Sequence, residues 1–304
     1  MAARSILLYH RIADDPVDPF SLCVTPERFS EQLSRLRDGA DVVPLGELSS
    51  KRAPSRTSRP RVAVTFDDGY ADNLWNALPV ADEYGVPITI FVTSRALGRP
   101  DGFWWDRLAA QLLGRKEVDL ELQIAGAPLK ICLHGDSAGT QAMWALHRRL
   151  RPLPVSDIEA VVADVVNQLN GAKTGGSRTA VLSHDDLVRL ASHPLVDIGA
   201  HTTDHALLRR QPVSEQALTI TQSKTDLEDV IGSSVCHFAY PFGSRDSFDG
   251  RTVAAVRAAG FRSACSTLDG SVTIWSNRFY LPRRMVKDWD LADFEKHLVS
   301  WGIG

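Results

Sequence analysis

Six short apolar runs, rich in β-branched residues, are spread along the chain, and helical patterns lie between them. This alternation is typical of parallel strands joined by crossover helices, and it predicts an α/β fold. The helix signals agree with it, because Thr25 before Pro26 predicts a helix start. Ser183 with Asp186 resembles a capping box, and Gly232 stands where a helix should end. The predicted strands are residues 5–9, 62–66, 87–93, 196–200, 236–240 and 262–266.

Two polar segments that follow predicted strands bring together residues suited to hydrolysis. Asp67 and Asp68 come directly after the run 62–66, and because successive side chains point in different directions, the two carboxylates can take different roles. His201 and His205 follow the run 196–200. Their i, i+4 spacing predicts one turn of helix that presents both rings on one face. Two imidazoles and one carboxylate form a three-ligand metal set that leaves room for water.

A divalent cation in such a site supplies most of what amide hydrolysis requires. It lowers the pKa of a coordinated water from about 15.7 to about 7, and it polarises the acyl oxygen. Zn²⁺ is the first choice for these donors, although Co²⁺, Ni²⁺, Mn²⁺ and Fe²⁺ also suit them. Taken alone, Asp67 and Asp68 would be interpreted as a turn after a strand, and His201 and His205 as separate surface histidines. Their joint occurrence favours the metal site.

These segments resemble the motifs of the polysaccharide deacetylases of carbohydrate esterase family 4. Residues 65–70 match the first motif, residues 201–205 match the second, and residues 238–243 are a weaker match to the third. The stretches 7–11 and 281–283 are also similar to family members, so the matching pieces leave out mainly residues 98–180. The resemblance implies one catalytic domain over residues 1–304. Its expected fold is a distorted (β/α)7-type parallel barrel with the metal at the C-terminal ends of the strands.

The resemblance also implies a role for each residue of the first two motifs. Asp68, His201 and His205 correspond to the metal ligands. Asp67 corresponds to the general base that takes a proton from the coordinated water. The expected activity is therefore metal-dependent removal of an acyl group.

The third motif departs from the family, which has Arg-Pro-Pro-Tyr-Gly where this chain has Ala-Tyr-Pro-Phe-Gly at residues 239–243. Phe242 can still donate its backbone N–H to the oxyanion, since this role needs no particular side chain. Tyr240 is predicted to contact the substrate. The arginine that steadies the catalytic aspartate in the family is missing, and Arg283 is predicted to replace it in space. The alternative for Arg283 is an ordinary ion pair.

The late histidine that serves as general acid in the family has no equivalent in this chain. His10 ends the first predicted strand, on the barrel face where catalytic groups gather, and it is our candidate for this role. The alternative is a histidine that only supports the site through hydrogen bonds.

Residues 98–180 make the connection between the two ligand motifs longer than a strand-helix-strand crossover requires. The segment holds Phe-Trp-Trp-Asp at 103–106, a helical stretch at 107–113, a hairpin signal at 125–126 and helical patterns at 139–150 and 156–169. We predict an α-rich insertion that forms a lid, in which Trp104 or Trp105 offers a ring face to a sugar. Equally, these tryptophans could serve only to anchor the insertion.

Composition narrows the possible partners and the compartment. The chain has 304 residues with 34 basic and 37 acidic side chains, and this near balance argues against a nucleic-acid partner. No run approaches the roughly 18 apolar residues of a membrane span, and the first residues lack a signal-peptide pattern, so we expect a cytoplasmic protein. The sequence gives no indication of an oligomeric state.

A basic, Ser-rich stretch at 49–60 predicts an exposed loop. The cysteines lack metal or disulfide spacing, so four buried thiols are expected: Cys23, Cys132, Cys236 and Cys265.

The expected function is removal of an N-acyl group, in the first place N-acetyl, from an amino sugar or glycan precursor. One alternative is an amidohydrolase that acts on a small nitrogenous metabolite, as the allantoinase-like relatives of the family do. Another is a carbohydrate-binding protein of impaired activity, which the altered third motif and the missing histidine would explain. A phosphatase with an Asp-x-Asp nucleophile is excluded, because Asp67 and Asp68 are adjacent.

Overall fold

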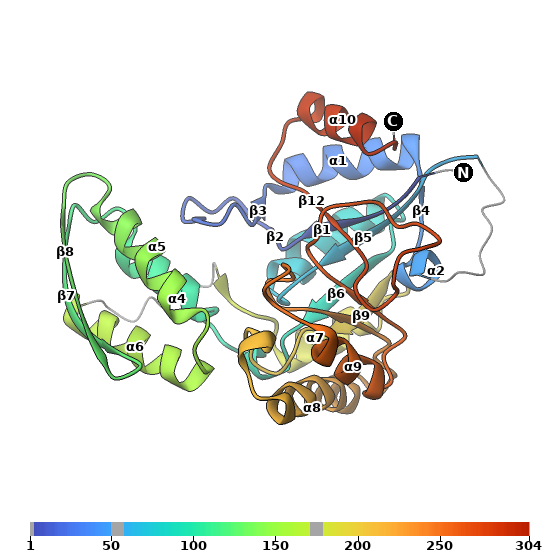
Figure 1. Ribbon diagram of the computed structural model, residues 1–304. Coiled ribbons are helices and arrows are strands. Elements are labelled where there is room, and N and C mark those ends of the chain that lie inside the picture. Colours follow the sequence, from blue (N-terminus) through green and yellow to red (C-terminus); the bar gives the residue numbers. More distant parts are fainter. Residues whose placement is uncertain (1–2, 50–57, 171–178, 304) are drawn as a thin grey trace.

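The computed structural model describes residues 3–49, 58–170 and 179–303. Figure 1 shows a curled sheet surrounded by helices and, beside it, a smaller lobe. Most of the loop predicted at 49–60 lies outside the described residues. Within the described part, no helix combines the length and the apolar character needed to cross a bilayer.

The main sheet has eight strands, and all its pairings are parallel. Seven of them follow the order β11-β10-β9-β6-β5-β1-β12, and β4 adds to β5. All six predicted strands are present, and the sheet curls into the half-barrel expected for a distorted (β/α)7 fold. The strands are β1 (Arg4–Tyr9), β4 (Asp41–Val42), β5 (Arg61–Phe66), β6 (Ile88–Val92), β9 (Val196–Ala200), β10 (His237–Ala239), β11 (Ser263–Cys265) and β12 (Arg284–Met285).

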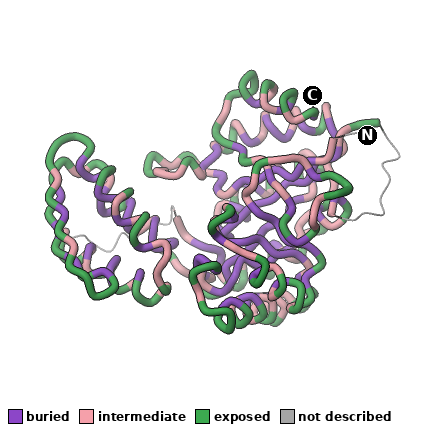
Figure 2. Tube along the Cα trace, viewed as in Figure 1, coloured by how far each residue is buried: buried purple, intermediate pink, exposed green. Residues whose placement is uncertain are grey.

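The central strands are apolar on both faces because both faces are covered. Every residue of β5 and of β6 is buried, and so are five of the six residues of β1. Continuous burial is typical of parallel sheets flanked by helices, and it explains why these strands appear as uninterrupted apolar runs rather than as alternating patterns. Figure 2 shows this buried band inside the barrel.

Local signals define several helix ends as predicted. The Thr25 hydroxyl accepts a hydrogen bond from the backbone N–H of Arg28 (3.4 Å), Ser183 and Asp186 form a capping box, and Gly232 ends α8 with φ 67°. The helices around the sheet are α1 (Pro26–Gly39), α2 (Leu45–Ser49), η1 (Asn73–Ala77), α3 (Leu78–Glu83), η2 (Ser94–Ala96), α7 (His184–Ala191), η4 (Leu208–Arg210), α8 (Val213–Ile231), α9 (Gly250–Ala258) and α10 (Leu291–Ser300).

The C-terminal part of the chain crosses the open side of the barrel. Residues 278–281 run along β11, where the backbone N–H of Ala264 donates to Arg278 O and that of Leu281 donates to Ala264 O (both 2.8 Å). The chain then enters β12, which pairs with β1. This path carries Arg283 from one edge of the half-barrel to the other.

The described residues of the predicted insertion, 98–170 and 179–180, belong mainly to the separate lobe of Figure 1. Leu120, Met143 and Val162 belong to its own hydrophobic core, which is distinct from the barrel core. The predicted hairpin and helices are present, so the insertion is α-rich with one two-stranded sheet. It contains α4 (Trp104–Leu112), β7 (Glu117–Ile124), β8 (Ala127–His134), α5 (Ala138–Leu150) and α6 (Val155–Gln168). A second small sheet, β2 (Arg11–Ile12) with β3 (Cys23–Val24), lies on the barrel.

The expectation of four buried thiols is wrong for two cysteines. Cys23 and Cys265 are buried, whereas Cys132 is exposed and Cys236 is half-buried. Cys132 lies on the outward face of β8, and Cys236 precedes β10. All four thiols are free, as the absence of disulfide spacing predicted.

Candidate active site

The candidate residues gather where the parallel strands end. Asp67 and Asp68 follow β5, His201 follows β9, and His10 follows β1. Because adjacent parallel strands end at one edge of a sheet, side chains distant in the sequence meet there.

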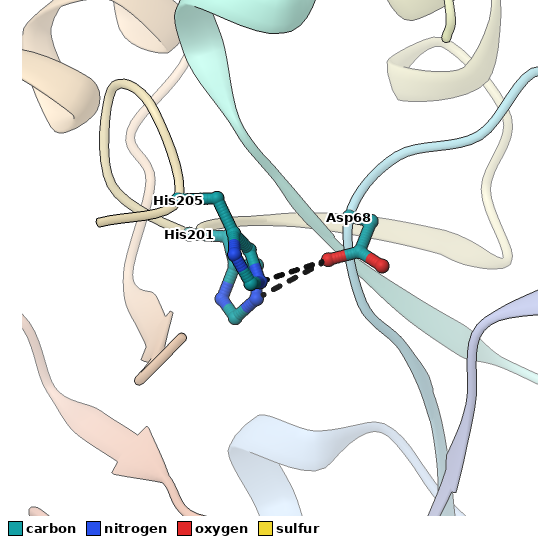
Figure 3. Close-up of side chains that lie close together, drawn as sticks. All are labelled: Asp68, His201 and His205. Carbon is teal, nitrogen blue, oxygen red and sulfur yellow. Dashed lines mark ion pairs between the residues drawn. The ribbon is translucent and has the colours of Figure 1, made fainter. Parts of the chain in front are cut away.

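Asp68, His201 and His205 converge on one point, as Figure 3 shows. Asp68 Oδ1 lies 3.5 Å from His201 Nε2 and 3.3 Å from His205 Nε2, and all three side chains are buried. Asp68 Oδ1 makes no hydrogen bond in the described structure, and neither does His205 Nδ1. A buried carboxylate oxygen without a donor is costly, so this donor set fits a cation better than it fits an empty space.

The orientation of the His201 ring also suits a ligand. Its Nδ1 lies 2.8 Å from the backbone oxygen of Ala239, at the end of β10. Since a carbonyl oxygen can only accept, Nδ1 carries the proton and Nε2 presents its lone pair toward Asp68. Such a hydrogen bond to the second ring nitrogen is the usual means of orienting a metal-binding imidazole.

The helical turn predicted for residues 201–205 is wrong, because the structure has an irregular turn there. Thr202 and His205 have φ values of 66° and 59°, in the left-handed region. The Thr202 hydroxyl accepts a hydrogen bond from the backbone N–H of His205 (2.9 Å) and closes the turn. The two rings therefore meet through side-chain capping of a turn rather than through helical spacing.

Strained backbone is concentrated at this site. The described structure has seven non-glycine residues with positive φ, and four of them are Asp68, Thr202, His205 and Phe242. Such conformations persist only where the surrounding structure enforces them, and they tend to mark functional sites.

Arg283 forms a two-point ion pair with Asp67. Its Nη1 and Nη2 lie 2.7 and 2.6 Å from the two carboxylate oxygens, and its Nε donates to Ser266 O (2.8 Å). Arg283 is 1 % exposed and Asp67 is 2 % exposed, so solvent does not screen the pair. Burial by itself would raise the pKa of Asp67, but the charge and hydrogen bonds of Arg283 hold that pKa below its usual value. Asp67 is thus kept ionised.

A cavity of about 180 Å³ opens over the four candidate residues and lies between barrel and insertion. His10, Trp105 and Phe242 line it, as do Asp67, Asp68, His201 and His205. His147 of α5 lines it as well, although the sequence analysis missed this residue. No local motif marks His147, because its place depends on how the insertion packs. A larger hollow of about 980 Å³, lined by Arg257, Arg262 and Arg278, contains none of these residues.

Tyr240 does not line the cavity. Its side chain is fully buried, its hydroxyl donates to Phe279 O (2.7 Å), and its ring stacks on Phe248 with centroids 4.2 Å apart. The substrate contact predicted for Tyr240 is therefore at odds with its position in the core. Phe242, two residues further on, faces the cavity and packs its ring against His205 (4.7 Å).

A buried hydrogen-bond chain holds Trp105 against the site. The indole N–H of Trp105 donates to the Tyr70 hydroxyl (3.0 Å), which donates to Asp106 Oδ2 (2.9 Å). One face of the Trp105 indole stacks on Phe103, and the ring packs against His205 with centroids 4.7 Å apart. This hydrogen-bond chain connects α4 of the insertion to Tyr70, two residues after Asp68.

An Asp106→Asn variant tests the cost of this buried carboxyl group. Burial raises the pKa of Asp106 from 3.8 to about 7, although hydrogen bonds from Phe103 and Tyr70 oppose the shift. The folded protein therefore keeps a proton that the unfolded chain loses, and the free energy of unfolding decreases as pH rises from about 4 to about 7. We expect the variant to lack this decrease, worth up to a few kcal/mol. Urea unfolding of both proteins at about pH 5 and pH 8 measures it, and parallel pH profiles would contradict the assignment.

Comparisons with known proteins address the family and the fold of this chain. A family model described as polysaccharide deacetylase matches residues 55–264. YxkH of Bacillus subtilis (strain 168), named as a candidate polysaccharide deacetylase, is 33% identical over 99 residues. That alignment covers 32% of this chain and 34% of YxkH, about a third of each.

Solved structures show the same fold at low identity. The Streptococcus pyogenes deacetylase PplD, in complex with acetate, superposes with a TM-score of 0.61 at 16% identity and covers 97% of both chains. IcaB from Ammonifex degensii superposes with a TM-score of 0.62 at 16% identity, over 100% of this chain and 98% of its own. These structures support the barrel architecture.

Proposed function

The chain belongs to the polysaccharide deacetylase family, and from this premise we propose that it is a metal-dependent hydrolase that removes an N-acetyl group from an amino sugar of a glycan or glycan precursor. The observation that carries the proposal is the convergence of Asp68, His201 and His205 beside an aspartate, Asp67, that a buried arginine keeps ionised. Two nitrogen donors, one oxygen donor and an adjacent base meet the requirements of metal-assisted amide hydrolysis.

Members of this family generally use a divalent cation. In our proposal Asp68 Oδ1, His201 Nε2 and His205 Nε2 hold it, with Zn²⁺ as the first choice and Co²⁺, Ni²⁺, Mn²⁺ or Fe²⁺ as alternatives. The bound cation supplies a water of lowered pKa and polarises the acyl oxygen. Two observations support this ligand set: Asp68 Oδ1 makes no hydrogen bond, and the His201 ring is oriented by the Ala239 carbonyl.

Asp67 acts as the general base in this proposal and accepts the proton of the attacking water. The paired oxygens of its carboxylate are held by Arg283, so its orientation does not depend on the substrate. Because Arg283 also lowers the pKa of Asp67, the proton that Asp67 takes is readily passed on. Arg283 is thus a positioning residue that replaces the guanidinium absent from the third motif.

The Phe242 backbone N–H is the proposed donor to the oxyanion. Phe242 has φ 62°, and its carbonyl oxygen accepts a hydrogen bond from the Thr267 hydroxyl (2.8 Å). This bond fixes the backbone beside the cavity without the help of the phenyl ring. Because this donor is held in place before the reaction, no free-energy cost of reorganisation arises when negative charge develops on the acyl oxygen.

Two further imidazoles line the cavity, and the proposal gives them different roles. His10 lines the cavity together with Asp67, and in the proposal it receives the proton from the base and delivers it to the amine. Burial lowers the pKa of His10, and the charges of Asp68 and Asp67 oppose this shift. Burial, with help from Arg151, lowers the pKa of His147 to about 4, and this ring on the insertion wall contacts the substrate as a neutral group.

Glutamine variants of the two histidines separate these roles. His10→Gln is expected to lower kcat about 10²-fold with little change in KM, because it removes the proton path. His147→Gln is expected to raise KM with little change in kcat, because it removes binding that the ground state and transition state share. Steady-state acetate release measures both, and the reverse pattern would exchange the two assignments.

The cavity limits what can reach the metal ligands. Its volume of about 180 Å³ and its wall of Trp105, His147 and Phe242 suit the acyl end of one sugar residue. Trp105 contributes to this wall, and its contact with substrate stays a prediction because Phe103 already covers one of its ring faces. We propose that the lobe of residues 98–180 acts as the lid of the site within a single catalytic domain.

Removal of the metal provides the direct test of the proposed function. Treatment with a chelator is expected to abolish acetate release from N-acetylated amino sugars, and Zn²⁺ or Co²⁺ should restore it. Full activity in chelator-treated, metal-free protein would contradict the proposal. Hydrolysis of small ureides without acetate release would instead favour the allantoinase-like alternative. Substrate binding without turnover would favour the carbohydrate-binding protein of impaired activity. The Arg283–Asp67 pair removes one argument for that alternative, because it replaces the arginine missing from the third motif.

A further inference from the structure

The outer face of the β7–β8 hairpin carries a second group of metal-binding side chains. The two strands pair over eight residues each, from Glu117 opposite His134 to Ile124 opposite Ala127. Along β7 every second residue is buried in the core of the insertion, which anchors the hairpin and turns the intervening side chains outward. Figure 1 shows the hairpin on the side of the insertion that faces away from the barrel.

Asp119, Cys132 and His134 meet on this face. Asp119 is directly opposite Cys132 in the ladder, and His134 lies two residues further along β8, on the same face. The Cys132 thiol donates to Asp119 Oδ1 (2.8 Å), and its sulfur lies 3.9 Å from His134 Nε2. The three donor atoms lie within 4.8 Å of one another.

A fourth residue, Glu117, lies beside the imidazole at ion-pair distance. His134 Nδ1 lies 3.7 Å from the Glu117 carboxylate, while Nε2 faces the Cys132 sulfur. A carboxylate that attracts the Nδ1–H leaves the Nε2 lone pair available, and this arrangement is usual behind histidines that bind metals.

We propose that Asp119, Cys132 and His134 form a second, peripheral transition-metal site, and that Zn²⁺ is its preferred ion. Zinc bonds of about 2.3 Å to sulfur and about 2.0–2.2 Å to nitrogen and oxygen allow one ion to contact all three atoms after small side-chain rotations. Cys132 binds as the thiolate, and its proton is released to solvent. Because the face is open, water completes the coordination. This site shares no residue with the candidate active site.

Cobalt provides a probe that distinguishes the two sites. A thiolate bound to Co²⁺ gives a charge-transfer absorption band, and the Asp68–His201–His205 site contains no sulfur. Titration of the full-length protein with Co²⁺ is expected to produce this band, with a final amplitude that corresponds to one thiolate-bound ion per chain. Cys132→Ser should abolish it, and Cys236→Ser, which changes the half-buried cysteine outside the cluster, should leave it intact. A band that persists in Cys132→Ser, or that never forms in the wild type, would overturn the proposal.

The affinity for zinc tests the role of Glu117, which lies beside the His134 imidazole. Glu117→Gln is expected to weaken zinc binding at the hairpin about 10-fold, the usual minimum for loss of such a partner. Glu121→Gln is the matched control, since Glu121 lies on the same face of the same strand but pairs with Lys130 (2.7 Å). Equal affinities for both variants would contradict the role of Glu117. Zinc content should fall by one equivalent in Cys132→Ser whether or not the active site binds metal, so the two proposals can fail separately.

Discussion

An Asp67→Asn variant is expected to release acetate about 10²–10⁴-fold more slowly than the wild type while it retains its metal. The asparagine amide preserves the shape of the side chain and can accept a hydrogen bond, but it cannot take a proton from water. Asp67 is not among the three converging residues proposed as ligands, so metal content should not change. Acetate release under saturating substrate, together with metal analysis of the same sample, measures both quantities.

Asp68→Asn is the matched variant, because it alters the neighbouring carboxylate. It removes the charged ligand and should lower metal content along with activity. The contrast between two adjacent aspartates separates the loss of a base from the loss of the cation. Unchanged turnover in metal-loaded Asp67→Asn would overturn the assignment of the base.

Arg283→Met is expected to lower the free energy of unfolding by about 3–5 kcal/mol, because it leaves the Asp67 carboxylate buried without its partner. Activity should fall as well, since the base loses both its orientation and its lowered pKa. Denaturant unfolding measures the first effect and acetate release the second. Arg251→Met removes an arginine from an exposed ion pair and should leave stability nearly unchanged.

The loss of stability in Arg283→Met should depend on pH with a defined sign. In the wild type the pKa of Asp67 is below its unfolded value of 3.8, so the stabilising contribution is complete above that value and is lost as pH falls through the folded pKa. Without Arg283, burial raises the pKa of Asp67 instead. The stability deficit of Arg283→Met should therefore shrink as pH falls below the raised pKa, where Asp67 becomes neutral.

The double variant Asp67→Asn/Arg283→Met separates stability from catalysis. With both charges removed, most of the lost stability should return, because neither buried charge remains unpaired. Activity should not return, because the base is still absent. A double variant as unstable as Arg283→Met would show that Arg283 stabilises the fold mainly through other contacts, such as its bond to Ser266 O.

Much of the barrel could be predicted from local patterns. Strands such as β5 and β6 are buried on both faces, so each must be a continuous apolar run, and such a run is visible without knowledge of its partners. The capping residues of α1 and α7 act within one turn of helix, so their signals are equally local. The turn at 201–205 was missed because i, i+4 spacing does not distinguish a helical turn from a side-chain-capped turn with left-handed residues.

The side-chain environment of the site was less accessible to prediction. Tyr240 and Phe242 follow the same strand two residues apart, but one belongs to the core and the other to the cavity. The backbone conformation of Phe242, with φ 62°, breaks the simple alternation on which a prediction would rest. His147 reaches the cavity only because α5 packs beside the barrel.

Motif residues were sufficient to identify the family, the parallel barrel, and the two aspartates and two histidines of the candidate site. The reason is that a buried strand and the polar residues at its end are both encoded over a few neighbouring residues. Tertiary structure alone decided which guanidinium pairs with Asp67, which aromatic rings form the cavity wall and which histidine the insertion contributes. Arg283 is 216 positions from Asp67, and only the passage of the chain across the open side of the barrel brings them together. Contacts of that kind depend on how whole elements pack, so the sequence offered Arg283 only as a candidate, with an ordinary ion pair as the alternative.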